Sequence, residues 1–284
     1  MVTLDTDTLL RTGEAGQVVS YTLTLKNSGS VTDSYTVIID DRLGRDIRFQ
    51  TSLYGNGYDG ALYTGELAPQ AQIPITVWVR IPSSPMLDVL SNTVTIRAIG
   101  FYDVSDDIEL VTLISSFQEA NGQVIMEAEN FASQKQLGGH FWLSQTKLNG
   151  YVGSGYINGL PDTDLRFVSV YSTNPELRYT INLTTTGVYT VWLRGYAPNA
   201  AGDSVYIGLD ETTPITLTGF VPGEWRWASS DANSGVVRIE VTEPGLHTFY
   251  LWQREDGLRL DRILLTTNSG YNPSGNGPPE SEFR

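Results

Sequence analysis

Hydrophobic and polar residues alternate along most of the chain. In Val19–Lys26 the odd positions are apolar and the even positions are polar, and the same alternation runs through Ile73–Ile81 and Asn92–Ala98. A period of two is typical of strands with one buried face, whereas the spacing of an α-helix is nearly absent. Turn clusters rich in Gly, Asn, Ser and Pro separate these segments at intervals typical of a β-sandwich. The pattern therefore predicts an all-β chain.

The alternating segments fall into two sets, with a polar stretch over Ser115–Gly122 between them. We expect an N-terminal domain over residues 1–115 and a second domain over 123–267. The last stretch, 268–284, is rich in Gly, Pro and Ser, a composition typical of a flexible tail or linker. That ending favours a piece of a larger multidomain protein.

Composition excludes several classes of function. The 284 residues include 32 acidic and 18 basic side chains, for a net charge of −14, and a nucleic-acid partner would need clustered Lys and Arg. The absence of Cys excludes disulfides and thiolate chemistry, and two His are too few for a histidine-rich metal centre. No apolar run reaches the length of a membrane span, so we expect no membrane insertion.

The N-terminal domain carries Gly16–Gly29, a strand that ends in an Asn-x-Gly turn, followed by the Pro-flanked strand Leu67–Val77. These segments resemble the bacterial immunoglobulin-like spacer domains that stand beside glycosidases and carbohydrate-binding modules. The resemblance implies a β-sandwich that acts as a spacer.

The second domain contains a series of ordered motifs: Met126–Phe131, Gly150–Ile157, Gly187–Arg194, Pro222–Trp227, Pro244–Phe249 and Gly257–Ile263. In this order they resemble the calcium-containing β-jelly-roll carbohydrate-binding modules of families six and thirty-five. The resemblance implies a non-catalytic jelly roll that binds a polysaccharide or oligosaccharide.

Three carboxylates in these motifs are candidate metal ligands. Glu127 and Glu129 lie two positions apart on a strand, so both project from one face, where their like charges need compensation. Asp261 alternates with apolar residues and is expected to point inward, which is costly for an unpaired carboxylate. By resemblance these three residues bind one structural Ca²⁺. The alternative is that these acids form ion pairs with Arg178, Arg259 or Arg262.

Sugar recognition needs flat aromatic surfaces together with hydrogen-bonding groups, and five of the six Trp follow residue 115. By resemblance, an early loop supplies Trp142 or Tyr151, and a later loop supplies Trp227 with Trp225 beside it. Any of these Trp residues is also a candidate for the sandwich core.

The segment Trp252–Gly257 is more polar than a simple hairpin and suggests a loop that presents Trp252, Arg254 and Asp256 to a ligand. The alternative is a salt bridge from Arg254 to a neighbouring acid that fixes a turn. Arg259 occupies the position of an Asn in the families named above. A guanidinium favours carboxylate or sulfate, so this departure makes an acidic glycan a candidate ligand.

Together these features predict a non-catalytic, secreted or surface protein in which the second domain targets a larger protein to a glycan. The alternative from a different class is a structural or adhesive protein of the cell surface without specific glycan binding. Retention on polysaccharides distinguishes the two hypotheses.

Overall fold

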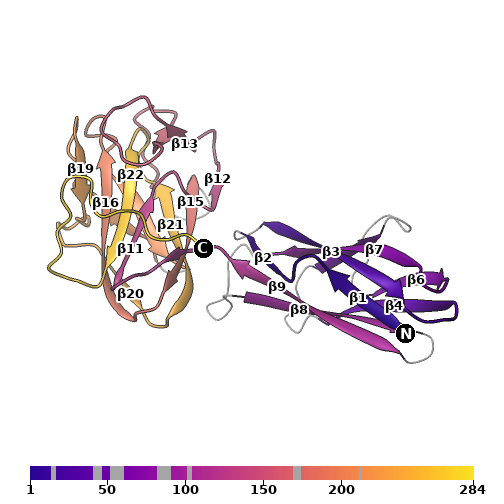
Figure 1. Ribbon diagram of the computed structural model, residues 1–284. Coiled ribbons are helices and arrows are strands. Elements are labelled where there is room, and N and C mark those ends of the chain that lie inside the picture. Colours follow the sequence, from indigo (N-terminus) through magenta and orange to yellow (C-terminus); the bar gives the residue numbers. More distant parts are fainter. Residues whose placement is uncertain are drawn as a thin grey trace. The chain divides into compact units, whose positions relative to one another are not determined.

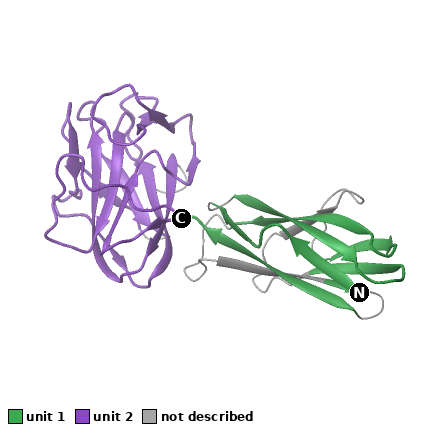
Figure 2. Cartoon of the chain, viewed as in Figure 1, with its two compact units in different colours: residues 1–84, 89–115 green, residues 85–88, 116–284 purple. Residues whose placement is uncertain are grey.

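A computed structural model describes residues 1–13, 17–40, 47–51, 61–81, 91–100, 104–168, 174–210 and 213–284. Every regular element in these ranges is a strand, which confirms the prediction of an all-β chain. Among the described residues, no helix of sufficient length and hydrophobicity to cross a membrane is found. The chain divides into two compact units on either side of the bond between Ser115 and Ser116 (Figure 2).

The first unit consists of two sheets in the described residues. One sheet has the strand order β1-β3-β7-β5 and the other the order β2-β9-β8-β4-β6. Tyr21 lies buried between them, and its hydroxyl donates to the carbonyl oxygen of Val111 at 2.6 Å. The strands of the first sheet are β1 (Val2–Thr6), β3 (Val18–Asn27), β7 (Gln72–Arg80) and β5 (Ile47–Thr51), and those of the second are β2 (Leu10–Gly13), β9 (Ser105–Ile114), β8 (Ser91–Gly100), β4 (Asp33–Asp40) and β6 (Ala61–Leu67).

The second unit also has two sheets (Figure 1). One follows the order β10-β15-β21-β17-β18, with β12 paired to β15, and the other the order β13-β14-β22-β16-β19, with β11 paired to β22 and β20 to β16. The strands of the first are β10 (Phe117–Gln118), β15 (Glu176–Leu183), β21 (Gly245–Gln253), β17 (Val205–Leu209), β18 (Ile215–Leu217) and β12 (Ser133–Lys135). Those of the second are β13 (Phe141–Gln145), β14 (Tyr156–Leu160), β22 (Arg259–Thr266), β16 (Gly187–Tyr196), β19 (Trp225–Ala228), β11 (Gln123–Glu127) and β20 (Arg238–Val241).

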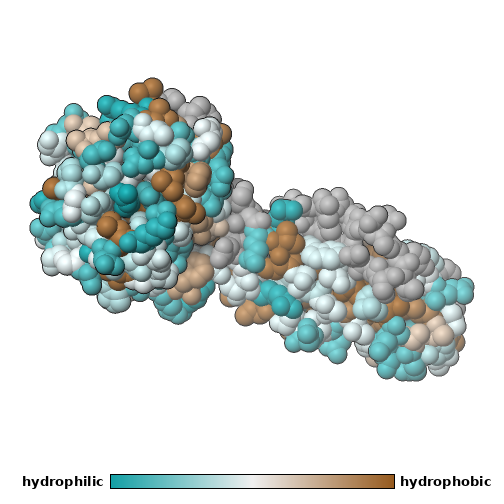
Figure 3. Space-filling view, turned by 90° about the horizontal axis from the view of Figure 1, so that it is seen from above, coloured by the Kyte–Doolittle hydropathy of each residue, from teal (hydrophilic) through white to brown (hydrophobic). Residues whose placement is uncertain are grey.

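Alternation along these strands builds the core of the second unit. On β21, Phe249 and Leu251 are fully buried in the main hydrophobic cluster, and on β22 Ile263 and Leu265 join it. The two sheets thus enclose one apolar layer. On the molecular surface shown in Figure 3, hydrophobic residues form small patches among hydrophilic ones. Burial of this layer is the main favourable contribution to folding.

The C-terminal stretch differs from the predicted flexible tail. It runs back across the second sheet and pairs with the beginning of the unit: Ser281 donates its backbone N–H to Ile125, and Arg284 exchanges backbone hydrogen bonds with Ser116. The Phe283 ring packs against Phe117 with centroids 4.8 Å apart. Composition alone suggested flexibility because Gly and Pro are common in linkers. Here these residues allow an extended segment to follow the surface of a sheet.

Candidate functional site

Three neighbouring strands of the second sheet bring an aromatic and two polar side chains together at one end. Arg259, the first residue of β22, lies opposite Tyr196 of β16 on one side and Asn158 of β14 on the other. The pairing of β16 with β22 shifts register between Arg194 and Gly195. Such a bulge bends a strand and redirects its side chains, and it sits next to the position of Tyr196.

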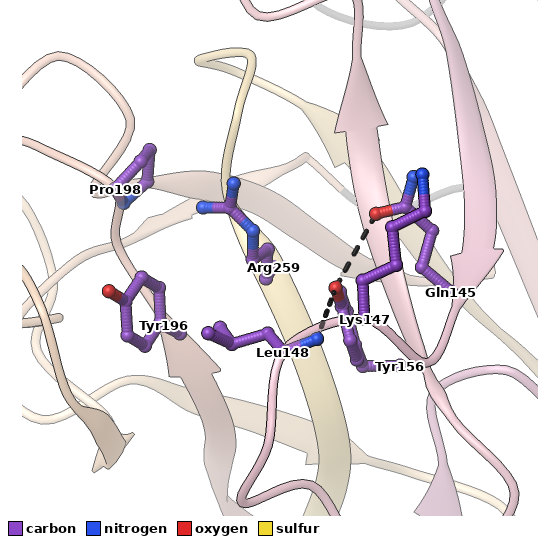
Figure 4. Close-up of a pocket in the computed structure, with 7 residues that line it drawn as sticks. All are labelled: Gln145, Lys147, Leu148, Tyr156, Tyr196, Pro198 and Arg259. Carbon is purple, nitrogen blue, oxygen red and sulfur yellow. Dashed lines mark hydrogen bonds between the residues drawn. The ribbon is translucent and has the colours of Figure 1, made fainter.

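A hollow of about 350 Å³ opens beside Arg259 (Figure 4), and we refer to it as the Arg259 hollow. Arg259, Tyr196 and Pro198 lie on one side in this view, and Gln145, Lys147 and Tyr156 lie on the other, with Leu148 between them.

The hydroxyl of Tyr156 organises one wall of the hollow. It donates to Oε1 of Gln145 at 3.4 Å and accepts the backbone N–H of Leu148 at 3.3 Å.

Two of the predicted aromatic residues adjoin this hollow. The ring of Trp225 lies 5.4 Å from that of Tyr156 and 5.7 Å from that of Tyr196, and its indole N–H donates to Asn149. The ring of Tyr151 lies 5.8 Å from Tyr156. Trp225 and Tyr151 therefore support the aromatic residues that line the hollow.

The charges of the Arg259 hollow are positive. The guanidinium of Arg259 lies 5.5 Å above the ring of Tyr196 and donates to the carbonyl oxygen of Gly257 at 3.4 Å. Within the part of the chain that the structure describes, neither Arg259 nor Lys147 forms a salt bridge with an acidic side chain. The arrangement combines aromatic faces, an amide and two cations, which are groups that bind anionic, hydroxylated molecules.

Two other tryptophans predicted to bind a ligand are buried. Trp142 is 2% exposed and belongs to the main core. Trp227 is 9% exposed, because the C-terminal stretch covers it: its indole N–H donates to Gly275, and Gly277 lies against its ring. Both residues therefore serve packing, as in the alternative that a Trp of this domain belongs to the sandwich core.

Trp252 is likewise closed to a ligand. It is 3% exposed, its indole N–H donates to Oε2 of Glu176 at 2.7 Å, and its ring stacks on Tyr250 with centroids 4.9 Å apart. Register explains this position, because β21 places Trp252 opposite Glu176 of β15 and Tyr206 of β17.

The polar residues after Trp252 fix a turn. Arg254 donates to Oε1 of Glu255 at 2.8 Å and to the hydroxyl of Ser204, as the salt-bridge alternative anticipated. Asp256 is 1% exposed and accepts the backbone and side-chain hydrogens of Thr163 and the backbone N–H of Leu165. Arg254 and Asp256 thus hold two surface loops against the sheet, and the prediction that they contact a ligand is not supported.

Glu127 and Glu129 come together beside Gly153, but not on one strand as predicted: β11 ends at Glu127, and Glu129 lies in the turn that follows. A Cβ on Gly153 would lie 3.0 Å from the carboxyl carbon of Glu127 and 3.2 Å from Oε1 of Glu129. Oε1 of Glu127 pairs with Arg262 at 3.0 Å, and Oε1 of Glu129 accepts the backbone N–H groups of Ser154 and Gly155. Burial raises the pKa of Glu127 to about 7, although the nearby Arg262 lowers it.

Asp261 is fully buried, as predicted, but an arginine compensates it. Its Oδ2 lies 2.5 Å from a terminal nitrogen of Arg194, and its Oδ1 accepts the backbone N–H of Val152. Arg194 also donates to the carbonyl oxygens of Gly150 and Gly275. Burial raises the pKa of Asp261, and Val152 and Arg194 lower it in part.

These contacts fit a calcium ion at the two glutamates better than at Asp261. Among the described residues, Oε2 of Glu127 and Oε2 of Glu129 are buried without a hydrogen-bond partner, whereas both oxygens of Asp261 are engaged. In the same residues no group of three or more His, Cys, Asp or Glu side chains is arranged to hold a metal ion. Carbonyl oxygens or water would have to complete the coordination.

Sequence reasoning missed most of the residues that line the Arg259 hollow. Tyr196 ends the alternating strand that contains Trp192, and Tyr156 stands inside the motif Gly150–Ile157, so both were signalled. Gln145 and Lys147 had no signal, because Gln145 reaches the hollow through the pairing of β13 with β14 and Lys147 lies in the loop after β13.

Comparisons with known proteins place the second unit in a family. Residues 116–280 match the family described as the glycosyl hydrolase family 115 C-terminal domain. The chain is 30% identical over 198 residues to a protein of Formosa agariphila described as uncharacterized protein P23, and the match covers 57% of this chain and 48% of that protein. The chain thus spans about half the length of this relative.

Two solved structures are also similar to the chain. A family 35 carbohydrate-binding module from Clostridium thermocellum is 14% identical, with a TM-score of 0.36 and coverage of 50% of this chain and 96% of the module. The family 35 module of Abf62 from Cellvibrio japonicus is 14% identical, with a TM-score of 0.38 and coverage of 55% and 99%. The family assignment rests on the match of residues 116–280, which covers more than half of the chain. The chain belongs to the family of glycosyl hydrolase family 115 C-terminal domains.

Proposed function

We propose that the second unit is a non-catalytic module that binds an acidic glycan in the Arg259 hollow. The observation that carries the proposal is the pair of cations, Arg259 and Lys147, beside the rings of Tyr156 and Tyr196. Aromatic faces suit the C–H face of a pyranose, and a guanidinium suits a carboxylate or sulfate. The family assignment to a glycosyl hydrolase C-terminal domain supports a ligand of this class.

The non-catalytic role is supported by the state of the acids that would be candidates for glycoside hydrolysis. Such hydrolysis needs two carboxyl groups that face a common cleft. Glu255 and Asp256 are buried, and their oxygens are engaged with Arg254 and with loop backbone. We therefore propose that the module acts by proximity, keeping a larger extracellular protein at its glycan through weak contacts that multivalency strengthens.

Affinity gel electrophoresis of the full chain tests this proposal. We expect retardation in gels that contain an acidic polysaccharide, such as polygalacturonate or glucuronoxylan, and none in neutral mannan. Because a charge-assisted hydrogen bond contributes about 1.5–3 kcal/mol, Arg259→Met should weaken binding by about ten- to a hundredfold. Added salt should weaken binding as well.

The matched control is Arg226→Met, which removes the same charge from an exposed arginine that pairs with Glu224 outside the hollow. Equal losses in both variants would mean that binding follows net charge and not the hollow. Absence of retention on every polysaccharide, with oligomers present in solution, would favour a structural or adhesive protein instead.

We also propose that the module binds a structural Ca²⁺ through Glu127 and Glu129. The support is the pair of buried carboxylate oxygens that have no hydrogen-bond partner among the described residues. An ion at this position would stabilise the start of the unit, and it is assigned no part in glycan recognition.

A further inference from the structure

A second hollow of about 280 Å³ adjoins the first, and we refer to it as the Asn130 hollow. It opens between the end of β13 and the loop around Ser154, and Gln145 lines both hollows. A ligand larger than one sugar unit that occupies the Arg259 hollow therefore has a neighbouring hollow within reach across Gln145.

The lining of the Asn130 hollow is chemically unlike that of its neighbour. Its side chains are hydroxyls and amides, with one carboxylate and no basic group: Glu129, Asn130, Ser144, Gln145, Thr146 and Ser154. A second carboxylate, that of Glu280, binds the amide nitrogen of Asn130 at 3.0 and 3.1 Å. Without a bound cation the Asn130 hollow is thus polar and negative, whereas the Arg259 hollow is aromatic and positive.

Because the two hollows differ in charge, a ligand that spans both would bind in one orientation, with its acidic unit in the Arg259 hollow. In the calcium-free protein a carboxylate or sulfate in the Asn130 hollow would face Glu129, with Glu280 behind the Asn130 amide, and like charges at short range repel each other. Hydroxyl groups instead meet acceptors and donors: with its NH₂ held by Glu280, the Asn130 amide leaves its oxygen as an acceptor, and Ser144 and Thr146 offer hydroxyls.

We propose that the Asn130 hollow is a second subsite, which takes an uncharged, hydroxyl-rich sugar unit next to the acidic unit in the Arg259 hollow. The proposal rests on the function proposed above and adds a specificity to it. The module recognises a junction between an acidic and a neutral sugar, and it discriminates against a run of acidic units.

Isothermal titration of the full chain in the presence of a chelator, with matched small ligands, tests this subsite. The probes are glucuronic and galacturonic acid as monosaccharides, the same acids linked to one neutral sugar, and digalacturonic acid. We expect the mixed disaccharide to bind about tenfold more tightly than its acidic monosaccharide, a gain equivalent to one or two additional hydrogen bonds. Digalacturonic acid should show no such gain.

A blocking variant separates the two hollows. Ser144→Trp should fill the Asn130 hollow and remove the tenfold gain while the affinity for the monosaccharide stays unchanged. The matched control is Leu143→Trp, whose exposed position immediately precedes Ser144 on β13 and does not line either hollow. Thr146→Tyr provides a second blocking variant if Ser144→Trp does not fold.

The outcomes distinguish the subsite from the proposed function. If both acids bind as monosaccharides but the mixed disaccharides show no gain, or if the gain persists in both blocking variants, the second subsite is overturned and the Arg259 hollow stands. If no acidic sugar binds the wild-type chain in any form, the proposed function fails, and the subsite falls with it.

Discussion

Two arginines at opposite ends of one short segment show how differently this unit uses the same side chain. Arg254 and Arg259 lie five positions apart, and each guanidinium stacks over a tyrosine, at 5.8 Å from the Tyr206 ring and 5.5 Å from the Tyr196 ring. Arg254 is held by Glu255 and Ser204, whereas Arg259 forms no close salt bridge among the described residues, and its charge acts on Asp162 only through space. The first arginine fixes a turn, and the second lines a hollow.

The difference teaches that residue type does not separate a binding arginine from a structural one. What separates them is the acid that the fold brings alongside, because a guanidinium already paired has little left to offer a ligand. The partner of the indole N–H separates two tryptophans in the same way. Trp252 donates to the buried carboxylate of Glu176 on the neighbouring strand, whereas Trp225 donates to a loop carbonyl oxygen beside the Arg259 hollow.

The largest expected effect comes from truncating one residue in each region, which tests whether Trp252 is structural and Arg259 binds the ligand. Trp252→Ala should lower the free energy of unfolding of the second unit by about 3–5 kcal/mol, because it leaves a cavity and removes the hydrogen bond to Oε2 of Glu176, whose Oε1 stays paired with Arg178. Arg259→Met should change it by less than about 0.5 kcal/mol and weaken glycan binding instead. Urea unfolding followed by Trp fluorescence reports mainly on the second unit, which holds five of the six Trp.

The opposite pattern would overturn the distinction. If Trp252→Ala kept its stability and lost glycan binding, the segment Trp252–Asp256 would be the binding region, as the sequence suggested. Trp252→Phe separates the two contributions of this side chain, because it keeps a ring to stack on Tyr250 and removes the hydrogen bond to Glu176. We expect it to be less destabilising than Ala.

The sequence predicted the strands because their period-two pattern is local, but the same pattern wrongly extended the strand of Glu127 through Glu129, which lies in the turn after β11. It could not predict which aromatic residues are open. Trp142 and Trp252 are covered by strands distant in sequence, and Trp227 is covered by Gly277 of the C-terminal stretch. Partners of this kind depend on register and chain path, which a single strand does not encode.

Calcium binding extends the comparison from arginines to buried acids, which differ in whether an arginine already neutralises them. Asp261 is compensated by Arg194, whereas Oε2 of Glu129 has no partner among the described residues. Addition of Ca²⁺ to about a hundred times its dissociation constant should raise the free energy of unfolding by about 2.7 kcal/mol. Thermal melting with calcium and with a chelator measures this shift.

Glu129→Gln is the matched variant for calcium, since it removes the charge and keeps the shape. We expect its melting temperature to be the same in calcium and in chelator. A wild-type melting temperature that does not respond to chelator would contradict the calcium proposal and would leave Arg262 and Arg194 as the sole compensation for these acids.

The smallest expected change in stability concerns His247. This side chain is buried and lies next to an acidic partner, Asp210, as Arg254 lies next to Glu255. It is 3% exposed. Its Nδ1 lies 2.8 Å from Oδ2 of Asp210 and its Nε2 lies 3.0 Å from the carbonyl oxygen of Glu243. Both ring nitrogens face acceptors, so the doubly protonated imidazolium satisfies both contacts and the neutral ring satisfies one.

Burial alone would lower the pKa of His247, but the hydrogen bond and charge of Asp210 together with the carbonyl oxygen and charge of Glu243 outweigh burial, and the pKa is raised above 6.5. The folded state therefore holds this proton more tightly than the unfolded state does. The resulting stability is fully present below the unfolded pKa of about 6.5 and is lost as the pH rises through the higher folded value. We expect a loss of about 1 kcal/mol, the contribution of one hydrogen bond. Urea unfolding from about pH 6 to about pH 9, compared with His247→Gln, isolates this contribution from the other titrating groups. An identical pH dependence in the two proteins would show that the ring stays neutral and that a buried charge in this unit needs the permanent cation of an arginine.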